Sequence, residues 1–315
     1  MKLRRAFIAS CCAAMLPLLS GCRSGGIPLL NFIPLAKPVG MLLVTDTPLE
    51  SADALIRHEP FRKAFSTEIK REVHLELALP LLLEPQLGIG WQQFALVSPA
   101  QYAALSKPAD FSVVAIAGES AESASRTAKI VVRADSELQN ISQLRDKIVA
   151  FGPAEDSRSF LAAMVLLESE GVSRDQLKRQ IIPVPGSLLH LGKPEEIARS
   201  VASGSAAAGV LDDSYWRRLP ERGVGDELCR ASFRVIGETM ALPDRVVLGS
   251  PKVDAETVQK TRDFLFAAGK KHGSALAEIR LGGYAPATDA DVENMRRLAS
   301  VQGLFPSKPK PASDE

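Results

Sequence analysis

The chain has 315 residues, with 38 Lys and Arg against 37 Asp and Glu, so its net charge at pH 7 is +1. The first 21 residues hold three of the basic and none of the acidic residues, which leaves 35 positive against 37 negative charges, a net charge of −2, on the rest. This balance excludes the basic surplus typical of nucleic-acid-binding proteins, so we expect no nucleic acid partner.

The N-terminus has the order of a cleaved export signal. Lys2, Arg4 and Arg5 precede an apolar run over residues 6–19, and Leu19-Ser20-Gly21-Cys22 follows. A charged start, a short apolar run and small residues before the cleavage site are typical of secretory signals. The run is shorter than the ~20 residues that a membrane span needs, which disfavours the alternative of an uncleaved anchor.

The Leu-Ser-Gly-Cys end of this segment resembles the lipobox of bacterial lipoproteins. The resemblance implies cleavage after residue 21 and lipid attachment to the thiol of Cys22, which would hold the protein in the periplasm at a membrane. Residues 4–8 also resemble a twin-arginine signal, so the export route stays open. Of the other cysteines, Cys11 and Cys12 would leave with the signal, and Cys229 alone cannot form an intramolecular disulfide.

Short apolar runs alternate with amphipathic runs along the rest of the chain. After a tether over residues 22–38, rich in Gly, Pro and Ser, the pattern predicts these elements in chain order: strand 41–44, helix 60–69, strands 73–79, 94–97, 113–117, 130–132 and 148–151, helices 159–170 and 195–203, strand 206–211, and helices 254–271 and 289–299. A polar tail over residues 306–315 ends the chain.

This alternation predicts an α/β fold whose mostly parallel sheets are flanked by helices on both faces. About 290 residues are many for one such sheet, so we expect two lobes. Residues 39–125 with 235–305 would form the first lobe and residues 126–234 the second. The chain would cross twice between them.

Ligands of open α/β sheets bind outside the carboxyl ends of the strands. The polar residues that follow the predicted strands are therefore candidates for the site. They are Thr45, Asp46 and Thr47; Ser98, with Tyr102 one turn later; Asp156, Ser157, Arg158 and Ser159; and Asp212, Asp213 and Ser214.

Residues 156–159 open a predicted helix. The unpaired N–H groups and positive dipole of a helix start attract anions. Ser157 and Ser159 could add hydroxyl donors, and Arg158 a fixed charge. The alternative is that Asp156 or Ser157 only caps the helix. Asp213 is equally open, because it could cap the next turn, contact a ligand or neutralise Arg158.

The sequence contains no catalytic set. The four histidines lack metal-ligand spacing, and neither a Gly-x-Ser-x-Gly elbow nor a phosphate-binding Walker loop occurs. We therefore expect no enzyme activity, no cofactor and no metal.

Four segments resemble the substrate-binding proteins of phosphate, phosphite and phosphonate ABC transporters, the periplasmic phosphonate-binding family. Residues 97–102 (VSPAQY) are similar to its Gly-Pro-x-x-Tyr turn, and residues 130–136 and 141–147 (IVVRADS, ISQLRDK) to its VVRADSGI…LADLKGK stretch. Residues 151–159 stand where the family has a Ser-Thr-Ser-Gly loop, and residues 208–214 (AGVLDDS) resemble its Asp-containing turn. Arg158 replaces the Thr of that loop and Phe160 its Gly.

The resemblance implies a two-lobed, type 2 periplasmic-binding-protein fold that captures its ligand between the lobes. It implies oxyanion-donor roles for Ser157 and Ser159, a contact of Asp213 with the far end of the ligand, and a first-lobe contact from Tyr102. The partners would be a small anion (phosphonate, phosphite or phosphate), an ABC permease and, through Cys22, a membrane; the protein would be a monomer. The alternative is a sensory or partner-binding lipoprotein that keeps the fold with a diverged pocket.

Overall fold

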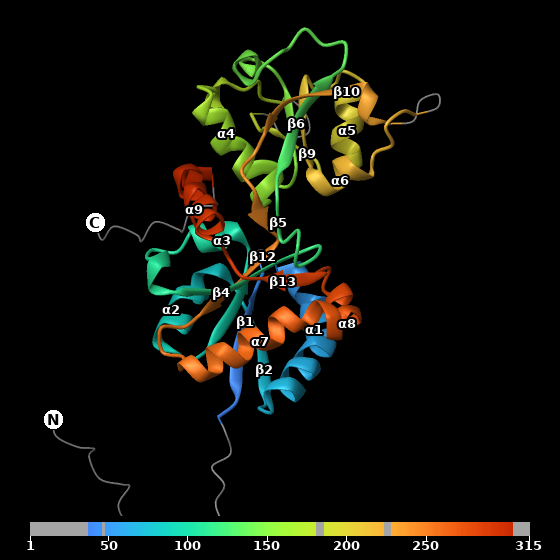
Figure 1. The fold of residues 1–315 in the computed structure, drawn as a ribbon. Helices are drawn as coiled ribbons and strands as arrows, with labels where there is room; N and C mark the ends of the chain where they lie inside the picture. The colour runs from blue at the N-terminus through green and yellow to red at the C-terminus, as the bar shows by residue number, and fades with distance from the viewer. Residues whose placement is uncertain (1–36, 46–47, 181–185, 224–227, 305–315) are drawn as a thin grey trace, which may run out of the picture. The chain divides into compact units, whose positions relative to one another are not determined.

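The computed structural model describes residues 37–45, 48–180, 186–223 and 228–304 (Figure 1). The expected signal peptide, Cys22, most of the tether, Asp46, Thr47 and the tail lie outside these ranges. Within them, no helix combines the length and the apolar character needed to cross a membrane.

A six-stranded sheet with the order β13-β4-β12-β3-β1-β2 forms the first half of the fold. Its strands are β1 (Val39–Val44), β2 (Val73–Ala78), β3 (Phe94–Val97), β4 (Ser112–Gly118), β12 (Arg245–Gly249) and β13 (Gly283–Ala285). β1 is parallel to β2 and β3, whereas β12 is antiparallel to β3 and β4, and β13 is antiparallel to β4. The amino ends of β12 and β13 therefore lie at the edge where β1 and β3 end.

A five-stranded sheet with the order β10-β6-β9-β7-β8 forms the second half. Its strands are β6 (Ala128–Arg133), β7 (Val149–Phe151), β8 (Leu189–His190), β9 (Ala208–Asp212) and β10 (Phe233–Glu238). β7 is parallel to β8 and β9, and β6 runs antiparallel between β9 and β10. A two-stranded ribbon of β5 (Ser125–Arg126) and β11 (Leu242–Pro243) lies where the chain passes from one sheet to the other and back (Figure 1).

Helices cover the two sheets. They are α1 (Pro48–Ile69), α2 (Pro80–Ile89), α3 (Pro99–Ala103), α4 (Ala163–Ser169), α5 (Pro194–Ala202), α6 (Asp213–Arg218), α7 (Ala255–Lys271), α8 (Gly273–Glu278) and α9 (Asp289–Arg297). A π-helical turn, Ser157–Ala162, leads into α4, and a 3₁₀ segment, Leu298–Leu304, follows α9. Local signals explain several of these ends: the Asp254 carboxylate, for example, accepts from the N–H of Thr257 and caps α7.

The first sheet is buried on both faces, as the alternation of β1 shows. Val39, Met41 and Leu43 pack with Phe61, Phe65 and Phe264 of α1 and α7, and the rings of Phe65 and Phe264 stack with centroids 4.6 Å apart. Leu42 and Val44 point into a different cluster on the opposite face. A strand covered on both sides is expected to be apolar throughout, and the six residues of β1 are all buried.

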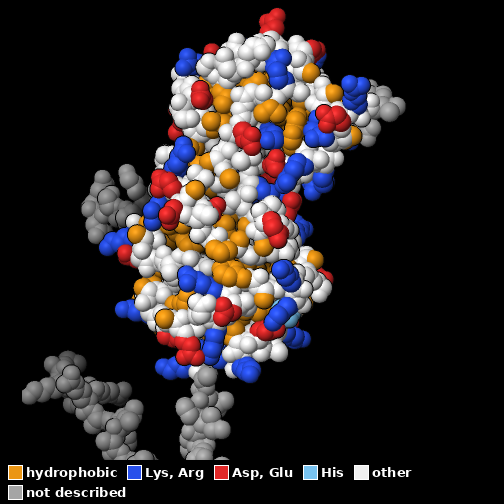
Figure 2. All heavy atoms as spheres, viewed as in Figure 1, with side chains coloured by type: hydrophobic (Ala, Val, Ile, Leu, Met, Phe, Trp, Pro, Cys, Tyr) orange, Lys and Arg blue, Asp and Glu red, His pale blue; other side chains and the backbone are white. Residues whose placement is uncertain are grey.

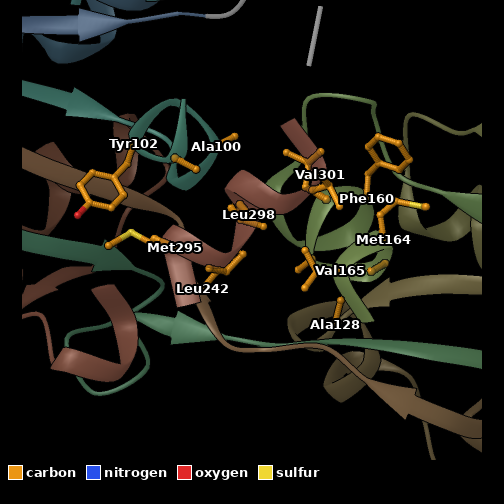
Figure 3. Close-up of a cluster of buried hydrophobic side chains, with 14 of the residues drawn as sticks. Ala100, Tyr102, Ala128, Phe160, Met164, Val165, Leu242, Met295, Leu298 and Val301 are labelled. Carbon is orange, nitrogen blue, oxygen red and sulfur yellow. The ribbon is translucent and has the colours of Figure 1, made fainter. Parts of the chain in front are cut away.

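The cluster that contains Leu42 and Val44 extends across both halves of the fold (Figure 3). Met295, Leu298 and Val301 follow one another at helical spacing and belong to the same buried cluster as Tyr102 near the first sheet and Phe160 beside the second. The segment Leu298–Leu304 contacts α3, the π-helical turn and α4. The last helical segment therefore packs against both halves.

The surface agrees with the balanced composition. On the face drawn in Figure 2, acidic and basic side chains are interspersed rather than gathered by sign. This face offers no broad basic patch of the kind that binds a nucleic acid backbone.

The α/β fold with two helix-flanked sheets is confirmed, and every strand and helix that we predicted is present, most of them with shifted ends. The sheets are mixed, because β12, β13 and β6 run against the other strands. Helix 60–69 begins earlier, at Pro48, and continues through Pro60. The sequence pattern did not predict α2 or the strands after residue 232.

Candidate functional site

A cavity of about 680 Å³ lies at the carboxyl ends of β1 and β3. Thr45 and Ser98 follow these strands on its wall, with Arg57 and His58 of α1 beside them. The loop after β7 supplies Pro153 and residues 155–158, so segments attached to both sheets enclose the cavity. The remaining polar lining comes from Asp244, Arg245 and Arg280.

Asp156 occupies the start of the π-helical turn. Its Oδ1 accepts hydrogen bonds from the backbone N–H of Arg158 (3.0 Å) and of Ser159 (2.6 Å), and from the Ser159 hydroxyl (2.7 Å). The close approach of the preceding loop requires a glycine, because a Cβ at Gly152 would overlap the Ser159 Oγ. The chain's own carboxylate thus takes the donors that an anion would use, as in an ordinary N-cap.

Ser157 joins the two halves of the fold. Its hydroxyl oxygen accepts a hydrogen bond of 3.2 Å from the backbone N–H of Ala100 in α3, 57 residues away in sequence. The side chain is buried on the cavity wall. A hydroxyl retains a proton to donate when its oxygen accepts, so this contact leaves a donor available for a ligand.

Arg158 is held by two carboxylates. Its Nε donates to Asp212 at 2.6 Å, and its Nη1 lies 2.5 Å from the Asp244 carboxylate. Only 13 % of the side chain is exposed. Burial alone lowers the pKa of Arg158, but the charges of Asp244 and Asp212 outweigh it and raise the pKa above its usual value. The arginine is therefore charged and already compensated.

Asp212, rather than Asp213, neutralises Arg158 and caps the following helix. Its Oδ1 accepts from the N–H of Ser214 at 2.8 Å. Burial raises the pKa of Asp212, and the Arg158 charge and the Ser214 hydrogen bonds reverse this into a net decrease. Asp213 instead pairs with Lys129 (3.5 Å) and Arg217 (3.0 Å).

A second buried arginine extends this network at the ribbon. Arg126 of β5 is 6 % exposed, and its guanidinium lies 2.8 Å from Asp244, 2.6 Å from Glu119 and 3.7 Å from Asp212. Asp244 therefore contacts both Arg126 and Arg158 where the chain passes between the sheets. Each charge of this network has an opposite charge beside it, whereas Arg126 Nε and Nη1 make no hydrogen bond to the described residues.

The wall on the side of the first sheet carries three further arginines: Arg57, Arg245 and Arg280. Arg57 lies 4.0 Å from Asp53, and both side chains are substantially exposed. Within the described ranges, Arg245 and Arg280 form no ion pair. Arg280 has a φ of 58°, a left-handed conformation that is uncommon outside glycine.

His58 lies among these arginines. Its Nδ1 is 2.7 Å from the carbonyl oxygen of Ala54. Burial, and then the charges of Arg245 and Arg57, lower the pKa of His58 below 6.5, although the Ala54 hydrogen bond acts in the opposite direction. The histidine is therefore neutral at pH 7.

Of the eight ligand-binding residues that the sequence predicted, Ser98, Ser157 and Arg158 line the cavity. Ser159 hydrogen-bonds Asp156, Asp213 lies in its own ion pairs, and Tyr102 is 1 % exposed in the core (Figure 3). Asp46 and Thr47 lie outside the described ranges. Among the residues described, no group of three or more His, Cys, Asp or Glu side chains is placed to hold a metal ion.

Comparison with known proteins identifies the family. Residues 44–292 match the model for the periplasmic phosphonate-binding substrate-binding protein of ABC transporters. The chain belongs to this family. Phosphonate-binding proteins of this kind are periplasmic components of ABC transporters rather than enzymes.

Solved structures share the fold of this phosphonate-binding family member. XAC2383 from Xanthomonas citri, bound to chloride ion, is 19 % identical with a TM-score of 0.60; the match covers 85 % of this chain and 98 % of that one. PhnD1 from Prochlorococcus marinus, in complex with methylphosphonate, is 14 % identical with a TM-score of 0.56, over 85 % and 99 % of the two chains.

A TctC solute-binding protein from Polaromonas, without ligand, is 15 % identical with a TM-score of 0.52, over 86 % and 98 % of the chains. These similarities establish the fold as that of a type 2 periplasmic binding protein, as the sequence resemblance implied.

Proposed function

We propose that this protein is the substrate-binding lipoprotein of an ABC importer and captures a phosphorus oxyanion or a related small anion in the cavity between its two sheets. The observation that carries the proposal is the cavity itself. It lies at the carboxyl ends of β1 and β3, is enclosed from both halves of the fold, and is lined by four arginines. This is the position at which open α/β sheets bind ligands.

Capture involves hinge closure rather than chemistry. The hinge is the ribbon of β5 and β11 with the two chain crossings beside it. A rotation of one half against the other can be taken up there by a small number of residues. A ligand favours closure only if it binds the closed form more tightly than the open one. The closed form would then dock on the permease.

Similar proteins support an anionic ligand. The PhnD1 structure contains methylphosphonate, and XAC2383 has been solved with chloride ion and, in a second structure, with ATP. In this chain, Ser157 retains a donor on the cavity wall, and Ser98, which follows β3 and caps α3, lines the same cavity. We propose these two residues and Arg158 as part of the ligand site.

The sequence around Cys22 supports lipid attachment. Substitution Cys22→Ser should release the exported protein from the membrane fraction into the soluble periplasmic fraction, because the thiol that carries the lipid is lost. Fractionation followed by mass spectrometry of the N-terminal peptide measures both effects. Membrane retention of a Cys22→Ser protein whose N-terminal peptide shows that residues 1–21 have been removed would contradict the proposed anchor.

One observation favours the alternative of a sensory or partner-binding lipoprotein. Asp156 already occupies the helix-start donors that the family resemblance assigns to the ligand. In this alternative the fold is kept and the cavity no longer selects an oxyanion.

Thermal unfolding distinguishes the two functions. The protein without residues 1–21 and with Cys22→Ser would be heated with phosphate, phosphite, methylphosphonate, sulfate and tripolyphosphate in turn. A ligand present at 100 times its Kd adds about 2.7 kcal/mol to the free energy of unfolding and raises Tm measurably. A selective rise with a phosphorus anion supports transport; an unchanged Tm across the panel supports the alternative.

A further inference from the structure

Among the described residues of its lining, the cavity carries more positive charge than the carboxylates compensate. Arg158 is paired with Asp212 and Asp244, and Asp156 is satisfied by the start of the π-helical turn. The described part of the wall also carries Arg57, Arg245 and Arg280, together with the exposed carboxylate of Glu155.

These three arginines come from separate parts of the chain. Arg57 is in α1, Arg245 is the first residue of β12, and Arg280 lies in the turn between α8 and β13. Because β12 and β13 run antiparallel to β1 and β3, their amino ends and the ends of β1 and β3 meet at one edge. The sheet topology thus brings the three guanidinium groups to the same cavity.

The partners of these arginines are weak. The single ion pair of Arg57 is a 4.0 Å contact between side chains that are 41 % and 74 % exposed, which contributes little in water. Arg245 and Arg280 have no ion pair with any residue in the described ranges. The effect of both Arg245 and Arg57 on the pKa of His58 shows that they act on one small region.

We propose that Arg57, Arg245 and Arg280 form the anion-recognition site of this cavity and that its ligand carries two or more anionic groups, as an oligophosphate does. This inference rests on the proposed function and specifies the ligand class. A singly charged anion would compensate one guanidinium and leave the others unpaired, whereas linked anionic groups can accept bidentate hydrogen bonds from several arginines.

The size of the cavity agrees with such a ligand. Its volume of about 680 Å³ lies in the middle of the range of roughly 300–1,000 Å³ that accommodates drug-sized molecules. Arg280 has a left-handed backbone conformation, with a φ of 58°, that is uncommon for a residue other than glycine. That conformation places an arginine, instead of the usual glycine, at the cavity.

Titration of the soluble protein with inorganic tripolyphosphate and with inorganic phosphate tests the proposal. We expect tripolyphosphate to bind at least about tenfold more tightly, and we expect Arg57→Gln, Arg245→Gln and Arg280→Gln each to weaken it by about tenfold or more. Arg245→Lys keeps the positive charge without the paired donors, so it should lose less affinity for tripolyphosphate than Arg245→Gln. Arg296→Gln, on an exposed position of α9, is the matched control and should stay within about twofold.

The outcomes separate this inference from the proposed function. If the wild-type protein binds phosphate or methylphosphonate but tripolyphosphate no better, the ligand class is wrong. Tripolyphosphate binding that the arginine variants leave within about twofold would show that the anion sits elsewhere. If the wild-type protein binds none of the three anions, both the ligand class and the proposed function are wrong. Equal Tm values of the unliganded variants establish that each is folded.

Discussion

At the scale of single residues, one carboxylate changes how the site is understood. Asp156 accepts three hydrogen bonds from the start of the π-helical turn, where family resemblance places an oxyanion. An acidic side chain there stabilises both the unpaired N–H groups and the helix dipole. A ligand anion at this position would have to displace the Asp156 carboxylate. The arginines on the rest of the cavity wall are therefore better candidates for anion binding.

Replacing this cap should destabilise the protein measurably. Asp156→Ala leaves the N–H groups of Arg158 and Ser159 without their acceptor, and the loss of such a cap costs about 0.5–2 kcal/mol. Urea unfolding at pH 7 measures the difference. Glu155→Ala, one residue earlier and exposed, is the control; equal stabilities of the two variants would contradict the capping role.

His58 predicts a pH dependence with a defined sign. The pKa of His58 is about 6.5 in the unfolded chain and lower in the folded protein. At a pH between the two pKa values, the unfolded chain therefore binds more protons than the folded one. The free energy of unfolding should therefore fall as the pH is lowered through 6.5, and remain level above it. His58→Gln, which keeps a donor for the Ala54 carbonyl oxygen, should remove this part of the pH profile in urea titrations.

Anion binding should show the opposite trend. Arg57 and Arg245 oppose protonation of His58, and an anion bound between them would offset their charges. Sulfate keeps both of its charges between pH 7 and 5.5, so its binding should tighten as the pH falls over this range, and the effect should disappear in His58→Gln. A sulfate affinity that is independent of pH in the wild-type protein would place the anion away from His58.

Two site residues that the sequence did not predict, Arg245 and Arg280, share a topological cause. We considered the polar residues that follow strands, which is the correct rule for parallel strands and found Ser98, Ser157 and Arg158. Arg245 is the first residue of β12, and Arg280 precedes β13 by a few residues. Because β12 and β13 run antiparallel, it is their amino ends that reach the cavity. Only the strand directions, which the sequence pattern does not contain, bring them there.

At the scale of elements, an ion-pair network ties the loops together. Arg158 at the start of the π-helical turn contacts Asp212 at the end of β9 and Asp244 between β11 and β12. The two carboxylates are 21 % and 18 % exposed, so they are screened little by water. The pairing positions three segments on one side of the cavity.

Removal of the arginine should be costly. Arg158→Met leaves Asp212 and Asp244 partly buried, with Arg126 as the remaining cation, and breaking a buried pair typically costs about 3–5 kcal/mol. The pKa of Asp212 should rise once Arg158 is gone, since that charge holds it down. The difference in the free energy of unfolding between the wild-type protein and Arg158→Met should therefore shrink as the pH is lowered from 7 towards 4.

The same substitution combined with Asp212→Asn provides the control. The double variant has one uncompensated carboxylate fewer and should recover part of the lost stability at pH 7, as measured by urea unfolding. If Arg158→Met is as stable as the wild-type protein at pH 7, the network does not stabilise the fold.

Helices and strands were predictable to the extent that local pattern determines them. The apolar face of residues 60–69 predicted only the second half of α1. The helix begins at Pro48 and continues through Pro60, and Ala54 in its first half is buried. The run Leu81-Leu82-Leu83 has no helical periodicity, which explains why α2 was missed. Tertiary packing decided both cases.

At the scale of the whole described body, the two halves share more than their crossings. Met295, Leu298 and Val301 form one buried cluster with residues of both halves (Figure 3). Closure of the cavity must keep this cluster packed, so the rotation is expected at the ribbon of β5 and β11 rather than across α9. Periodicity predicted the helix 289–299, but not that its end spans both halves.

The central claim is that the cavity between the sheets binds an anion, and calorimetric titration tests it most directly. The soluble protein would be titrated with methylphosphonate, inorganic phosphate and tripolyphosphate at low salt and at about 0.5 M salt. We expect at least one anion to bind with one site per protein, and the affinity to fall at high salt because arginines are screened there. The absence of binding heat and of any change in Tm with all three anions would contradict the claim.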